Sequence, residues 1–167
     1  IDSRAAAGAM VLLIRRAQAL MEAAGDDGDF DALCQQLHRY QATLRTCFTL
    51  ENFDNLIKNG RMRPIVGTLL RSLGIHIIAD ATAEGTIHVA DKARGVGKTY
   101  RAITALMKAS KDCTDAEVVI SHCENLEGAM ALKRQILADL PVKQVDLLSC
   151  RGLTSFYAME KGLIVGY

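Results

Sequence analysis

The chain has 167 residues and carries 20 Lys and Arg against 19 Asp and Glu, so its formal net charge is only +1. Half of the residues are hydrophobic and 23% are charged, a globular composition that excludes a disordered or low-complexity chain. A net charge near zero gives no overall electrostatic attraction to nucleic acid. The absence of Trp disfavours a surface on which the bases of a single-stranded nucleic acid could stack. We therefore expect no nucleic-acid partner and a core sufficient for one domain, or for one domain and part of another.

The five cysteines are widely spaced and include no CxxC pair: Cys34, Cys47, Cys113, Cys123 and Cys150. This pattern does not suit a disulfide framework or a zinc ribbon, so we expect reduced thiols in a cytoplasmic protein. The longest apolar run, Ala5–Ile14, is shorter than the ~20 residues of a membrane-spanning helix. No membrane-spanning segment is expected. The chain starts at Ile1 without an initiator Met, which suggests a fragment of a longer protein.

Two helices are predicted at the start of the chain. The first runs from Ser3 to Ala24 and is apolar on nearly every side in its first half, so we expect it to be covered from several directions. An Asp cluster caps the second helix. This helix has one stripe at helical spacing, apolar except for Gln41: Phe30, Leu33, Cys34, Leu37, Tyr40, Gln41 and Leu44. No strand separates the two helices, so a boundary is expected near Thr46.

The middle of the chain contains short elements followed by a hairpin. An extended segment over 47–50 precedes a short helix over 51–57, and Pro64 favours the start of another helix. The β-branched segment Ile75–Ala79 and the alternating segment Thr86–Ala90 predict two antiparallel strands.

Helices and strands alternate in the rest of the chain. We expect a helix to about Ala109, a strand over 116–121, a helix over 126–140, and strands over 142–149 and 162–166. Together with the hairpin, this order predicts an α/β fold with a mixed β-sheet and flanking helices.

Two candidate cofactor motifs fail on their spacing. The segment 94–99 resembles a phosphate loop, but Lys92 occupies the position of its first Gly. The Asp cluster at 27–31 resembles a calcium loop, but Ala32 and His38 replace the required Gly and Glu. No His has a partner at metal-ligand spacing. We therefore expect no cofactor and no metal.

Two local basic groups stand out: Lys58, Arg61, Arg63 and Arg71, and Lys92, Arg94, Lys98 and Arg101. Each is either a solvated face or a patch that binds a carboxylate, a phosphate or an acidic partner surface. Adjacent His122 and Cys123 end a predicted strand, where their side chains point to opposite faces and do not address one another.

Several segments, in their order along the chain, resemble the DegV family of bacterial lipid-binding proteins. The resemblance rests on Ile1–Gly8, on Phe48–Leu56, on Lys58–Met62, on Lys92–Gly95 and on Ile120–His122. The family fold has two α/β lobes that hold a fatty acid between them. The resemblance implies that residues 1–46 are the helical remainder of a truncated N-terminal lobe and that residues 47–167 form the C-terminal lobe.

The resemblance also implies that the protein binds and presents a ligand but catalyses no reaction. Family members present the carboxylate of a bound long-chain fatty acid to a kinase related to dihydroxyacetone kinase, which forms the acyl phosphate. Arg61 and Arg94 correspond to family arginines expected at the kinase-facing surface, and Arg61 also at the ligand. The other expected ligand-binding residues are Ser3, Gly8, Ser149, Cys150, Arg151 and Gly152.

One departure from the family concerns the head-group site. The family usually carries Thr-His-x-Gly-Pro-Gly before the last strand, and this chain has Ser149-Cys150-Arg151-Gly152-Leu153-Thr154. Ser149 can replace the Thr as a donor, but Cys150 cannot replace an imidazole. Either the ligand differs, or Arg151 supplies the charge, or the protein no longer delivers ligand to a kinase.

Two alternatives to fatty-acid presentation remain open from the sequence. The first is a regulatory or interaction domain with altered or lost ligand binding. The second is a hydrolase that uses Cys150 with His122 or His88, which requires a thiol of lowered pKa.

Overall fold

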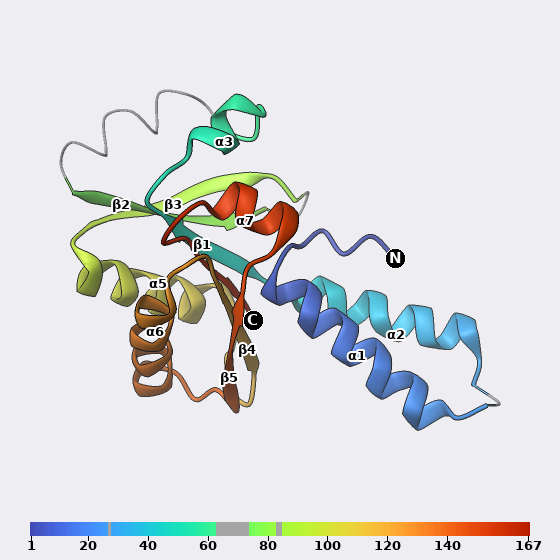
Figure 1. Ribbon diagram of the computed structural model, residues 1–167. Helices are drawn as coiled ribbons and strands as arrows, with labels where there is room; N and C mark the ends of the chain where they lie inside the picture. The colour runs from blue at the N-terminus through green and yellow to red at the C-terminus, as the bar shows by residue number, and fades with distance from the viewer. Residues whose placement is uncertain (27, 63–73, 83–84) are drawn as a thin grey trace.

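A mixed β-sheet organises the computed structural model, which describes residues 1–26, 28–62, 74–82 and 85–167 (Figure 1). Six strands of the described residues pair in the order β3-β2-β1-β6-β4-β5. Their bounds are β1 Thr46–Leu50, β2 Ile75–Ala81, β3 Ile87–Arg94, β4 Glu117–His122, β5 Gln144–Ser149 and β6 Leu163–Gly166. The β4–β5 pair is parallel and the other four pairings are antiparallel, so the predicted α/β fold with a mixed sheet is confirmed.

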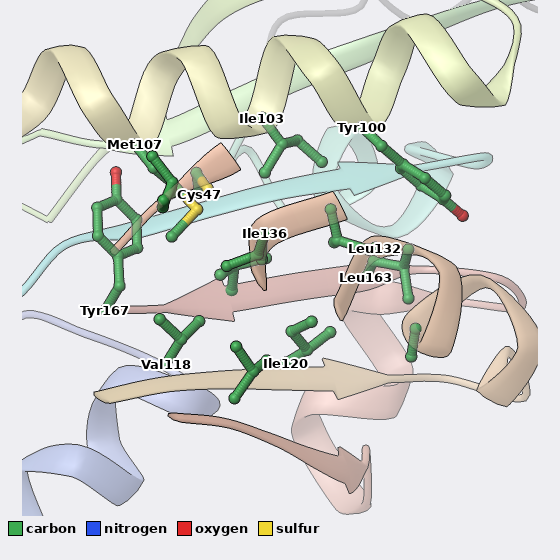
Figure 2. Packing of buried hydrophobic residues seen from close by; sticks show 14 of the residues in the cluster. Cys47, Tyr100, Ile103, Met107, Val118, Ile120, Leu132, Ile136, Leu163 and Tyr167 are labelled. Carbon is green, nitrogen blue, oxygen red and sulfur yellow. The ribbon is translucent and has the colours of Figure 1, made fainter. Parts of the chain in front are cut away.

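Two long helices, α5 (Val96–Ser110) and α6 (Leu126–Asp139), cover one face of the sheet. Ile103 and Met107 of α5 and Ile136 of α6 are fully buried there. Figure 2 shows these side chains meeting Val118 and Ile120 from the sheet. We call this set the helix-side cluster: Cys47, Ile78, Tyr100, Ile103, Met107, Cys113, Val118, Ile120, Ala129, Leu132, Ile136, Leu140, Val145, Leu163, Val165 and Tyr167.

A second apolar cluster lies on the opposite face of the sheet, under the short helices α3 (Asp54–Lys58) and α7 (Gly152–Ala158). We call it the cavity-side cluster: Phe48, Leu50, Phe53, Leu56, Met62, Ile77, Ala79 and Ala158. Strand β1 contributes to both clusters because successive side chains point to opposite faces. All five of its residues are buried, as expected of a central strand.

The two N-terminal helices, α1 (Gly8–Ala24) and α2 (Phe30–Thr43), extend to one side of the sheet (Figure 1). The first turns of α1 pack on β4 and β6, where Leu12 joins Val119 in a small apolar cluster with Leu13 and Leu44. Only this side of α1 is buried in the described structure, and Ile14 is 61% exposed.

Three predictions about helices need correction. The first helix begins at Gly8 rather than Ser3, because Ala7 has a positive φ of 51° that is incompatible with helix. A buried stripe was expected along α2, but no residue of this helix is fully buried, and Phe30 at its start is 74% exposed. Residues 152–158 form α7 where a loop was expected. The helix predicted from Pro64 to Leu73 lies outside the described residues.

The remaining predicted elements are confirmed. The hairpin forms as β2 and β3, and Ile87 and Val89 both pack toward the cavity-side cluster while His88 is exposed. Asn125 caps α6, since its Oδ1 accepts a hydrogen bond from Gly128 N at 3.1 Å.

Candidate functional site

A cavity of about 680 Å³ lies beside the cavity-side cluster. Phe48 and Leu50 of β1 and Ile164 of β6 contribute to its lining from the sheet. Leu153, Tyr157 and Ala158 of α7 and Leu56 of α3 add further apolar surface. Small-molecule sites are commonly concave, mostly apolar and ~300–1,000 Å³ in volume, so this cavity has the size and lining of a ligand site.

The N-terminal segment contributes residues 2–6 to the same cavity. Gln41 of α2 holds this segment through a hydrogen bond from its Nε2 to Ser3 O at 3.3 Å. The Ser3 hydroxyl donates to Ala5 O at 3.2 Å. The hydrogen bond from α2 therefore helps to hold Ser3 at the cavity.

Arg61 lines this cavity, as does Arg4 of the N-terminal segment. Arg61 follows α3 after Gly60, whose φ of +67° allows the chain to turn there. The backbone N–H of Arg61 donates to Leu56 O at 2.8 Å, which fixes the turn. Two predicted site residues therefore line the same cavity: Ser3, which precedes α1 in the sequence, and Arg61, which comes after α2.

The predicted segment 149–152 lies next to the cavity without lining it. Ser149, Arg151 and Gly152 are exposed, between the end of β5 and the start of α7. Cys150 is half-buried and packs against the cavity-side cluster. The four residues therefore sit where the chain enters the helix that supplies Leu153 and Tyr157 to the cavity.

Gly8 and Arg94 also lie outside the lining. Gly8 is buried where α1 meets the backbone of Val119. Arg94 is exposed at the end of β3, whereas Ile87 at its start lines the cavity. At ~3.3 Å per strand residue, roughly 20 Å separates these two ends of β3.

The chemistry of Cys150 does not support an activated catalytic nucleophile. Burial, with a smaller contribution from Cys123, raises the pKa of the Cys150 thiol to about 11, whereas a catalytic Cys needs a lowered pKa. His122 Nδ1 accepts a hydrogen bond from Asn125 N at 3.4 Å. His88 Nδ1 lies 2.9 Å from Asp80 Oδ1. His88 is on β3, the edge strand on the opposite side of the sheet from β5. The raised pKa of Cys150 and these partners of the two histidines argue against the hydrolase hypothesis.

The sequence reasoning missed the apolar lining supplied by α7. Leu153 and Tyr157 are four residues apart and reach the cavity from the same helix. This spacing of two apolar residues indicates a helix, but a segment of seven residues is too short for such a pattern to distinguish a helix from a loop.

The described part of the chain contains no cluster of three or more His, Cys, Asp or Glu side chains that could hold a metal ion. In the same residues, no helix is both long enough and apolar enough to cross a membrane.

Comparisons with known proteins agree with this architecture. A solved structure from Streptococcus pneumoniae, described as the fatty acid kinase (Fak) B3 protein loaded with linoleic acid, is 32% identical with a TM-score of 0.89. It is matched over 100% of this chain and 58% of its own. A DegV family protein from Eubacterium eligens loaded with heptadecanoic acid is 26% identical with a TM-score of 0.91, over 99% of this chain and 59% of its own.

Sequence comparison also finds DegV proteins among the relatives of this chain. A DegV domain-containing protein from Streptococcus gordonii is 32% identical over 168 residues, which cover 100% of this chain. The chain spans only 58% of the length of that relative. A family model described as "Uncharacterised protein, DegV family" matches residues 1–163. The chain therefore belongs to the DegV family.

Proposed function

We propose that this protein binds a long-chain fatty acid without catalysing a reaction and presents its carboxylate to a partner kinase. The cavity of about 680 Å³ is the observation that carries the proposal, because it combines a mostly apolar lining with two arginines, Arg4 and Arg61. An acyl chain needs a dry apolar surface, and a carboxylate needs a cation or fixed donors. The linoleic acid and heptadecanoic acid of the two solved relatives have these two parts.

The acyl chain would lie along the sheet beside Phe48 and Ile164, with α7 covering it through Leu153 and Tyr157. Arg61 and Ser3 would face the carboxylate, since both line the cavity. We propose that Ser149, Cys150, Arg151 and Gly152 complete the head-group end next to α7. Gly8 would act indirectly, by allowing the close approach of α1 that positions the segment containing Ser3.

The division of the protein into lobes is part of the same proposal. Residues 47–167 would form the C-terminal lobe, and residues 1–46 would be the helical part of an N-terminal lobe. The exposed apolar side chains of Ile14, Met21 and Phe30 on α1 and α2 support a further packing partner for these helices.

The kinase, related to dihydroxyacetone kinase, would contact the exposed arginines Arg61 and Arg94. Arginine suits this role because its guanidinium pairs with carboxylates and phosphates. We also propose that the protein acts in the cytoplasm, a compartment that suits its five unpaired cysteines.

Lipid retention tests fatty-acid binding directly. The protein, purified without detergent, is denatured and extracted, and the extract is analysed by mass spectrometry. We expect about one long-chain fatty acid per protein molecule. Folded protein that retains no fatty acid, and that takes none up when it is supplied, would overturn the proposal and favour a regulatory domain without ligand.

Acyl-phosphate formation tests presentation to the kinase. With the partner kinase, ATP and loaded protein, Arg94→Ala is expected to lower the rate at least ~10-fold at unchanged fatty-acid content, since it removes a proposed charged contact. Arg134→Ala, an exposed arginine on α6, is the matched control. Equal rates for the two variants would contradict the assignment of Arg94.

A further inference from the structure

The parallel strands β4 and β5 end with two neighbouring cysteines. His122 pairs with Ser149 in the strand register, and the next residues along the two strands are Cys123 and Cys150. The pairing continues one step beyond the strands, since Cys150 N donates to His122 O at 2.7 Å. Neighbouring strands lie ~4.8 Å apart, which falls within the ~4.4–6.8 Å between Cα atoms that a disulfide spans.

The two thiols also share a face of the sheet. Both Cys123 and Cys150 pack against the cavity-side cluster, and both are half-buried rather than enclosed. The pKa of Cys150 is raised in part by Cys123, as expected of neighbouring thiols. Cys47 and Cys113, in contrast, are buried in the helix-side cluster on the other face.

We propose that Cys123 and Cys150 are a modification site that closes reversibly to a disulfide. The oxidant is a low-molecular-weight disulfide such as oxidised glutathione. The Cys123 thiolate attacks one of its sulfurs and expels a thiolate. The Cys150 thiolate then attacks the Cys123 sulfur of the mixed disulfide and expels the second thiolate. The two protein thiols lose two electrons and two protons, and the small disulfide is reduced to two thiols.

The disulfide would act on the wall of the cavity. Cys150 lies two residues before α7, which begins at Gly152 and supplies Leu153 and Tyr157 to the cavity. Joining Cys150 to the end of β4 would tie the start of α7 to the sheet. The site is independent of the identity of the ligand, because it depends only on the strand register and the shared face.

Disulfide mapping tests the proposal. The protein is equilibrated with oxidised and reduced glutathione at pH 8, quenched with acid, alkylated and digested without reduction. Trypsin alone leaves Cys113 and Cys123 in one peptide, so a glutamate-specific protease is added to cleave after Glu117. The expected product joins residues 118–124 to residues 144–151, with a mass lower by two hydrogen atoms than the separate peptides.

Variants and a control complete the test. Cys123→Ser and Cys150→Ser are each expected to abolish this product, whereas Cys34→Ser on α2 is expected to retain it. The oxidised wild-type protein should unfold at a higher temperature than the reduced protein, and Cys150→Ser should lose that difference. Wild-type protein that yields only mixed disulfides with glutathione, a different cysteine pair or no disulfide would overturn the proposal.

Discussion

Gly8 at the start of α1 lies directly against the carbonyl oxygen of Val119 in β4, with no space for a β-carbon between them. Gly166 in β6 meets the backbone of Ala9 in the same way. Two glycines thus let the first turn of α1 rest on the sheet by backbone contact. This contact fixes where the preceding residues 2–6 run, and those residues line the cavity.

Replacing Gly8 with Ala is expected to lower the free energy of unfolding by about 1–3 kcal/mol, because the added methyl group collides with the backbone of β4. Gly97→Ala is the matched control, since Gly97 also lies in the first turn of a helix but has open space around it. Urea denaturation measures both. Equal stability of the two variants would show that α1 does not approach the sheet as closely as described.

Leu153→Asp is expected to weaken fatty-acid binding about tenfold or more, because it places a charged carboxylate against the acyl chain and repels the ligand's own carboxylate. The fold should tolerate the change, since Leu153 is 71% exposed. Leu137→Asp, on α6 across the sheet, introduces the same charge away from the cavity. Competition against a fluorescent fatty acid measures both, and equal affinities would remove α7 from the site.

Cys150 is expected to react with iodoacetamide roughly 100-fold more slowly at pH 7 than an ordinary thiol, because a pKa of about 11 leaves little thiolate. Its rate should rise about tenfold per pH unit until the pH approaches that value. Mass spectrometry of the peptide containing Cys150 follows the reaction, with Cys34 as the internal comparison. A fast reaction that levels off below pH 8 would instead indicate an activated thiol and revive the hydrolase hypothesis.

Asp139 at the end of α6 provides a test of pH dependence. The Thr104 hydroxyl donates to its Oδ2 at 2.7 Å, and this bond, followed by one from Gln135, holds the pKa of Asp139 below its ordinary value of 3.8. Because the pKa of Asp139 is lower in the folded state than in the unfolded state, its ionised carboxylate stabilises the fold at pH values above the unfolded-state pKa. This stabilisation is lost as the pH falls through the folded-state pKa.

Thr104→Val is therefore expected to raise the pKa of Asp139 toward 3.8, which NMR of the carboxyl carbon measures. The variant should lose stability relative to wild type near neutral pH, and the charge-dependent part of the difference should shrink in acid. Asp112 is the internal control, because its lowered pKa depends on Thr114. An unchanged titration of Asp139 would contradict the hydrogen bond.

The helices and strands were largely predictable where periodicity is strong. Strand β2 begins with a β-branched apolar segment, β3 alternates at its start, and α5 presents Ile103 and Met107 at helical spacing. Helix α7 was not predictable, because seven residues form too few internal hydrogen bonds to be stable alone. Tertiary contacts stabilise it: Ala158 is buried, and Asn55 Nδ2 donates to Phe156 O at 2.7 Å.

The cavity could be predicted only in part. Ser3 and Arg61 were identified through resemblance to a family, and both line it. Their meeting with Leu153 depends on strand order, because β1 and β6 must become neighbours before α3 and α7 can flank the same face. Local patterns contain no information about such pairings, since each requires contacts between residues distant in the sequence.

The sequence by itself determined the types of most elements, the class of the fold and the family, since these follow from side-chain periodicity, turn residues and ordered motifs. Only the tertiary structure decided that β1 is central, that Gly8 rests on Val119, and that Cys123 and Cys150 share a face. The physical reason is that a local pattern specifies which side of an element is apolar. The partner that covers this side is selected by the packing of the whole chain.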